Sequence, residues 1–224
     1  LEQRDSPGHK RADFCGADLR QAVLEGANLE RARMEGVNLR QANLRQSILT
    51  QASLAGANLT KANLEDSKLV GADLRHAKLT HANLHRVIGD EAALYNATLS
   101  GAQLHDSIFE RAHFEGADLS SADFTNATLV DSYLYGANLQ GAVLTGADLM
   151  GADLRRTDMS KAILFQTNLQ GALLDGARLN YARMMEADLE SAYLDDTDFR
   201  HADLHDAILR GADLRHANLE GTRL

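Results

Sequence analysis

Ala147-Asp148-Leu149-Met150-Gly151 is one copy of a five-residue unit that repeats along almost the whole chain. From Phe14 to Leu224 every fifth residue is Leu, Phe or Met, at all but one of 43 positions. The residue two places earlier is always small, Ala at 33 positions and Ser, Thr or Val at the others. Because the register never shifts, the sequence predicts no inserted loop between residues 12 and 224.

A period of five excludes both regular elements of secondary structure. In an α-helix five residues advance about 500°, so successive Leu side chains would point in different directions around the helix. In a continuous strand, residues five apart point to opposite faces. A chain that turns a corner after every unit can bury all of these side chains in one interior. If each corner is close to a right angle, four units close a coil of about 20 residues, and stacked coils form a rod about 50 Å long.

The unit Ala-Asp/Asn-Leu-X-X, as in Ala117-Asp118-Leu119-Ser120-Ser121, resembles the repeat of the pentapeptide repeat protein family. The resemblance covers residues 12–224, about 95% of the chain. It implies an all-β fold, a right-handed quadrilateral parallel β-helix, here of about 10–11 coils. We therefore expect residues 1–11 to form an N-terminal tail and residues 12–224 to form a single β-helix domain. Chains with such regular repeats resemble bacterial, and especially cyanobacterial, members of the family.

The composition favours a binding role. The chain has 23 Lys+Arg and 32 Asp+Glu, a net charge of −9, and this acidic surface argues against general affinity for nucleic acid or anionic membranes. No stretch approaches about 18 consecutive apolar residues, so no transmembrane helix is predicted. Phosphate-loop and dinucleotide-binding motifs are absent, and a filled interior leaves no concavity for catalysis. We therefore predict a non-enzymatic rod, without catalytic residues or cofactor, that binds a protein partner or serves as a scaffold.

A more specific function comes from the family resemblance. Some pentapeptide repeat proteins, including quinolone-resistance proteins, resemble B-DNA in shape and charge and bind DNA gyrase. Such mimicry needs a continuous, strongly acidic face. The 20-residue spacing sorts the outward residues into four faces, centred on Phe14, Leu19, Leu24 and Leu29, whose charges sum to −4, +2, −4 and −4. Because the acid is spread over three faces, DNA mimicry directed at a topoisomerase is the alternative and not the preferred function.

Two groups of outward-facing residues are candidate interaction surfaces. The first face carries four of the five tyrosines, with His113 beside them: Tyr95, Tyr133, Tyr135 and Tyr193. Tyr is a common anchor of protein interfaces, and a cross-strand aromatic ladder that only stabilises stacking is the alternative. The third face carries a second group: Val143, Ile163, Phe165 and Met185. Exposed apolar clusters often mark contact sites, and tolerated apolar substitution on a stable rod is the alternative.

Gly89 is the one position at which the repeat loses its central side chain. We favour a local distortion there, a bulge or kink in which Ile88 turns inward. A small cavity left by the missing side chain, at a cost of about 2–5 kcal/mol, and a binding notch are the alternatives.

Two histidines, His85 and His105, lie 20 residues apart and should stack on neighbouring coils, with His81 nearby. Two such imidazoles could share a metal ion. No carboxylate or thiol is obvious that would complete the set of ligands. The sequence therefore predicts no metal site.

The sequence gives less information about the cellular compartment and the oligomeric state. A single cysteine, Cys15, does not decide the redox compartment. The first residues lack the apolar run of a signal peptide, so the cytoplasm is favoured, with the periplasm or the thylakoid lumen open if a signal peptide has been removed. The repeat continues to Leu224 without a capping helix. Either the sequence has been cut there or a partner covers the end, and family members that dimerise end to end suggest a homodimer through the C-terminal coils.

Overall fold

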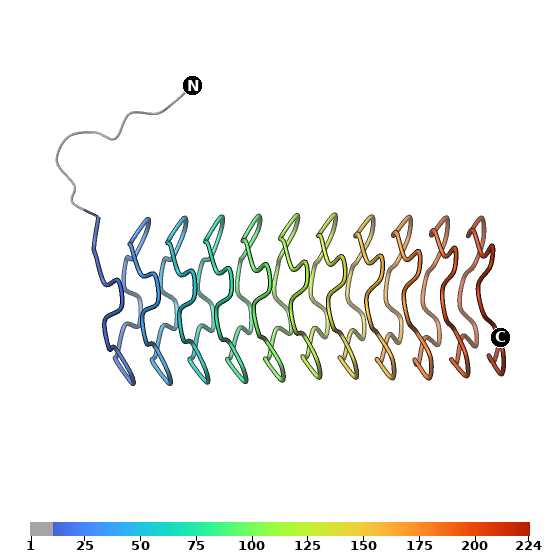
Figure 1. Cartoon of the computed structure of the whole chain (residues 1–224), viewed down its shortest axis with the longest axis horizontal. Helices are drawn as coiled ribbons and strands as arrows, with labels where there is room; N and C mark the ends of the chain where they lie inside the picture. The colour runs from blue at the N-terminus through green and yellow to red at the C-terminus, as the bar shows by residue number, and fades with distance from the viewer. Residues whose placement is uncertain (1–10) are drawn as a thin grey trace, which may run out of the picture.

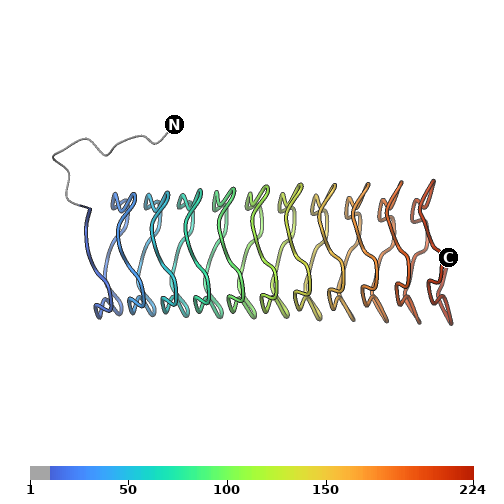
Figure 2. The same ribbon diagram turned by 45° about the horizontal axis from the view of Figure 1, so that its top comes forward.

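In the computed structural model, residues 11–224 wind through one continuous series of stacked coils (Figure 1). The β-bridges of this range are all parallel and isolated, and each joins residues 20 apart, from Asp13–Arg33 to Asp203–Arg223. Successive coils follow the chain order along the rod, as a view turned by 45° also shows (Figure 2). The expected right-handed quadrilateral β-helix is confirmed. Residues 1–10 of the expected tail lie outside the described residues.

The bridges form four columns, one on each face of the rod. They begin at Asp13 on the first face, Asp18 on the second, Val23 on the third and Asn28 on the fourth. Between bridges the chain makes only turns, so residues 11–224 contain neither a helix nor a longer strand. In this range no helix has the length and apolar character needed to cross a membrane.

Every corner is a tight turn with the same geometry. The N–H of Ala57 donates to the carbonyl of Leu54 at 2.9 Å and closes the turn over Ala55 and Gly56. The second residue after each repeat centre has a positive φ, from Gly16 through to the last turn. A type II turn requires positive φ at this place, where Gly is adopted without steric cost. Non-Gly residues occupy 27 of these positions, with φ between 53° and 61°.

Asp and Asn before the repeat centre support the turns. The Oδ1 atom of Asn58 accepts the N–H of Thr60 at 3.2 Å, and Oδ1 of Asp118 accepts the N–H of Ser120 at 3.1 Å. Neighbouring coils are also joined, since Nδ2 of Asn138 donates to Oδ1 of Asp118 at 3.1 Å. These residues therefore have a structural role, because short polar side chains can satisfy backbone donors at turns.

The interior consists of the repeat centres and the small residues two places before them. Leu59 and Ala57, for example, are fully buried. Some of the Ser and Thr residues at the small positions donate to a carbonyl, as the hydroxyl of Ser132 does to the carbonyl of Leu129 at 2.6 Å. The hydroxyl of Ser67 is buried without a hydrogen-bond partner.

The prediction of a local distortion at Gly89 is wrong. Ile88 points outward and keeps its bridges to both neighbouring coils. The N–H of Gly89 donates to the carbonyl of Ile108 at 2.7 Å, so the backbone ladder continues without a bulge. A Cβ atom at Gly89 would lie 2.2 Å from Cε1 of Phe109, whose side chain is fully buried one coil further on. The larger ring of Phe109 therefore fills the space of the missing side chain.

Candidate functional site

An aromatic column runs along the first face. The ring centroids of Tyr95 and His113 are 4.9 Å apart, and those of His113 and Tyr133 are 4.6 Å apart, with the rings close to parallel in both pairs. The Nδ1 atom of His113 also lies 3.1 Å from Oε1 of Glu115. Burial raises the pKa of Tyr95, and the nearby Glu115 carboxylate adds to this effect. These three rings are packed as a cross-strand ladder, which stabilises the stacking of coils.

Three tyrosines of the same face remain open to solvent. Tyr133 and Tyr135 are each 41% exposed and Tyr193 is 52% exposed. The guanidinium carbons of Arg155 and Arg156 both lie 5.9 Å from the ring centroid of Tyr135, a distance at which a cation is attracted to an aromatic face. The first face therefore presents exposed Tyr and Arg side chains, the residue types that most often dominate protein interfaces.

The second sequence-derived group, on the third face, is less open. Val143 and Ile163 are bridge partners on consecutive coils. All four residues of the group are half-buried: Val143, Ile163, Phe165 and Met185. Stacking along the rod covers much of each side chain, so this group offers less area to a partner than the tyrosines do.

Sequence reasoning missed a further exposed aromatic pair. Tyr181 is 53% exposed and stacks on His201, with ring centroids 5.0 Å apart. Tyr181 occupies a positive-φ turn position, away from the columns on which the candidate surfaces were defined. The signal available in the sequence was the 20-residue spacing between the two residues, because that spacing places side chains on top of one another in this fold.

Several Asp residues on the rod are paired with the Arg that follows two residues later in the same repeat. The guanidinium of Arg75 donates to both carboxylate oxygens of Asp73, at 2.8 and 2.7 Å, and these bonds hold the pKa of Asp73 below its usual value. The same pairing of Asp with the Arg two residues later recurs in four further units: Asp18–Arg20, Asp153–Arg155, Asp198–Arg200 and Asp213–Arg215. Because such pairs interrupt a continuous acidic face, the DNA-mimic alternative is not favoured over a general binding role.

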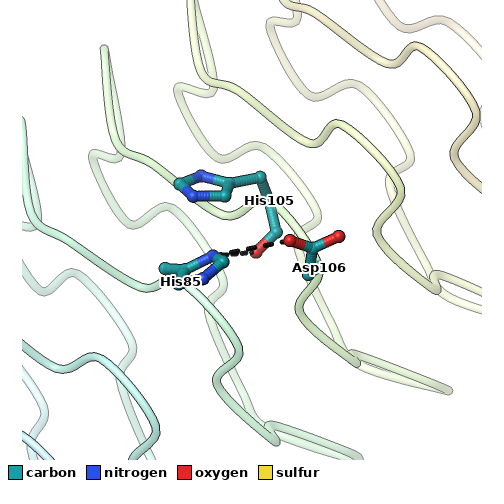
Figure 3. A group of neighbouring side chains, drawn as sticks. All are labelled: His85, His105 and Asp106. Carbon is teal, nitrogen blue, oxygen red and sulfur yellow. Dashed lines mark hydrogen bonds and ion pairs between the residues drawn. The ribbon is translucent and has the colours of Figure 1, made fainter.

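A compact group of potential metal ligands lies on the third face. The ring centroids of His85 and His105 are 3.9 Å apart, with the ring planes tilted by 31°, and the carboxylate of Asp106 lies beside them (Figure 3). Nδ1 of His85 is 3.0 Å from the carbonyl oxygen of His105 and 3.7 Å from Oδ2 of Asp106. The structure thus supplies a carboxylate that sequence reasoning failed to see. Asp106 sits at a positive-φ turn position, which the sorting of outward residues by column did not connect with the histidines.

Comparison with known proteins shows which family the repeats of this chain match. The family model for pentapeptide repeats matches eight times, at residues 10–46, 38–75, 47–86, 67–106, 97–134, 127–166, 164–189 and 182–221. A comparison with curated proteins found no match.

Among solved structures, the chain is similar to HetL, a pentapeptide repeat protein involved in heterocyst differentiation regulation from the cyanobacterium Nostoc sp. strain PCC 7120. The identity is 32%, over 94% of this chain and 90% of HetL, with a TM-score of 0.52. Rfr23 from the cyanobacterium Cyanothece 51142 is 33% identical over 45% of this chain and 58% of its own, with a TM-score of 0.32. QnrB1, a plasmid-mediated fluoroquinolone resistance protein, is 25% identical over 77% of this chain and 89% of its own, with a TM-score of 0.36. With a family model that spans nearly its whole length, this chain belongs to the pentapeptide repeat family.

Proposed function

We propose that this pentapeptide repeat protein is a non-enzymatic rod that binds another protein through Tyr133, Tyr135 and Tyr193 on its first face. The observation that carries the proposal is the exposure of these three rings on one face of a regularly stacked rod. Tyr contributes large contact area at a low cost in side-chain entropy. Pentapeptide repeat proteins are in general non-catalytic, and HetL is involved in the regulation of heterocyst differentiation; both points support a binding role.

The charges around the tyrosines indicate the chemistry of the partner. Arg155 is paired with Asp153, whereas Arg156 contacts the ring of Tyr135 and forms no ion pair within residues 11–224. A carboxylate of the partner placed opposite Arg156 would therefore form an ion pair with a guanidinium that has no such partner within residues 11–224. The phenol groups of the tyrosines favour a partner surface that is apolar and has hydrogen-bond acceptors at its edge.

The binding surface is tested by charge insertion on two faces. The wild-type protein and the variants Tyr135→Asp, Tyr193→Asp and Phe165→Asp are used to capture partners from cell extract, and a captured protein is then purified and titrated against each. We expect each Tyr variant to lose about 2 kcal/mol of binding free energy, about 30-fold in Kd, because interface anchors contribute this much. Phe165→Asp, on the third face, is the matched control. Binding that depends on Phe165 and not on the tyrosines would contradict the proposal.

A homodimer through the C-terminal coils also remains a proposal. Ile208, Leu219 and Leu224 are exposed in the last described coils, and a second copy, or any segment that continues the coil, would cover them. Sedimentation equilibrium across a range of concentrations, with Leu219→Lys as the variant, tests this. A protein that stays monomeric at every concentration would exclude the dimer. A cytoplasmic location likewise stays a prediction.

A further inference from the structure

We propose that His85, His105 and Asp106 form a binding site for a divalent transition-metal ion, with zinc as the best match. Imidazole nitrogen and carboxylate oxygen are ligands that zinc accepts. The potential ligand atoms of the three residues all lie within 4.8 Å of one another, and they form the only such group of three found among residues 11–224. Two histidines and one carboxylate would leave the fourth position of a tetrahedral ion for water or for a partner's side chain.

The pair of ligand atoms from His85 and Asp106 needs only a small contraction. With bonds of about 2.0 Å, neighbouring ligand atoms of a tetrahedral zinc ion lie about 3.3 Å apart. Nδ1 of His85 and Oδ2 of Asp106 are already 3.7 Å apart. Asp106 is exposed, and its other contact is a 3.3 Å hydrogen bond donated by Asn126, so rotation of its side chain is little hindered. A shift of a few tenths of an ångström would bring these two atoms to ligand spacing.

A second, independent observation comes from His105. Its Nδ1 atom is buried and has no hydrogen-bond partner among the described residues. A buried polar atom without a partner is unfavourable, and native structures rarely leave one uncompensated. A ligand bond from this nitrogen to an ion would compensate its burial. A purely structural histidine ladder offers no such compensation.

Arg86 fixes the orientation of His85. Its guanidinium contacts Nε2 of His85 and is held by Asp66 and Glu65, each at 2.7 Å. Because arginine only donates hydrogen bonds, Nε2 is the acceptor, and Nδ1 carries the proton donated to the carbonyl of His105. To bind an ion through Nδ1, the neutral ring of His85 would carry its proton on Nε2 instead, so the contact between Nε2 and Arg86 would open as the ion enters. Arg86 positions the ring but also places a positive charge beside the ion, which weakens binding.

The site is tested with zinc chloride and cobalt chloride on the untagged full chain. Calorimetry is expected to give one zinc ion per chain, and bound cobalt is expected to show the visible absorption of a tetrahedral complex. Asp106→Asn and His105→Gln should each weaken zinc binding by at least about tenfold, since even outer-shell partners of metal sites contribute 10–100-fold. Arg86→Gln should strengthen it, because the variant removes the cation beside the ion.

The matched control is His201→Gln, which removes a stacked histidine outside the site. This variant should bind zinc like the wild type. Circular dichroism in the presence of chelator confirms that each variant is folded, and Asp106→Asn keeps the shape of the exposed side chain even if His105→Gln perturbs packing. No one-to-one binding in the wild type, or equal affinity in wild type and Asp106→Asn, would overturn the proposal.

Discussion

The ring of Phe109 occupies the interior space that Gly89 leaves vacant on the preceding coil, so the two residues compensate each other across the stack. Phe109 also meets the ring of Phe114 edge to face at a centroid distance of 5.5 Å. The one defect in the repeat is thus matched by one oversized side chain 20 residues later. Close packing explains why the backbone ladder passes through Gly89 unchanged.

Gly89→Leu should destabilise the protein by about 1–3 kcal/mol, because the added side chain overlaps the ring of Phe109. The double variant Gly89→Leu/Phe109→Leu restores the regular repeat on both coils and should unfold close to the wild type. Urea unfolding of the two single variants and the double variant gives their coupling energy, expected at about 0.5–3 kcal/mol. Phe199→Leu, distant in the core, is the control and should add to Gly89→Leu without coupling. Purely additive losses for Gly89 and Phe109 would show that the two positions are independent.

Two buried serines should respond in opposite directions to the same change. Ser67→Ala should stabilise the protein by about 1 kcal/mol, because it removes a buried hydroxyl that has no partner. Ser132→Ala should destabilise it by about 0.5–1.5 kcal/mol, because the hydroxyl of Ser132 donates to the carbonyl of Leu129. Thermal unfolding midpoints of the two variants provide the comparison. A loss of stability in Ser67→Ala would mean that its hydroxyl is satisfied in solution.

Because one residue of each turn has a positive φ, a side chain added at such a position should lower the stability of the fold. Gly136 has a φ of +66°, and a Cβ atom added there would meet no neighbouring atom within 4 Å, so Gly136→Ala tests backbone strain without a clash. We expect a loss of about 1 kcal/mol, the left-handed penalty reduced by the lower chain entropy of Ala in the unfolded state. Thr145→Ala, at an ordinary turn position, is the control and should change stability by less than about 0.5 kcal/mol. Equal effects of the two changes on the urea midpoint would contradict the strain argument.

The Asp73–Arg75 pair predicts a pH dependence of stability. The hydrogen bonds from Arg75 lower the pKa of Asp73 in the folded protein. The contribution of the pair is therefore present above the unfolded pKa of Asp, about 3.9, and is lost as pH falls through the lower folded pKa. Arg75→Gln should be less stable than the wild type at neutral pH, and the difference should disappear in strong acid.

The measurement for this pair is the urea midpoint as a function of pH. Arg183→Gln removes an arginine that forms no ion pair within residues 11–224, and it should show no such pH-dependent difference from the wild type. A difference between wild type and Arg75→Gln that stays constant from neutral to strongly acidic pH would show that packing of the arginine, and not the charge pair, is responsible.

The sequence by itself determined that the chain coils, which residues point inward and that no loop interrupts the stack. The physical reason is that a period of five fits neither a helix nor a strand, whereas a corner after each unit buries every Leu and Ala. The period left the number of sides and the handedness open, and the family resemblance supplied both.

Only the tertiary structure decided how residues 20 apart meet. It placed Phe109 in the space of Gly89, brought Asp106 to His85, and stacked Tyr95 on His113. These outcomes depend on side-chain size and rotamer on neighbouring coils. The repeat specifies the position of each Cα atom but leaves the outward side chains free, and their mutual packing exists only once the coils are stacked.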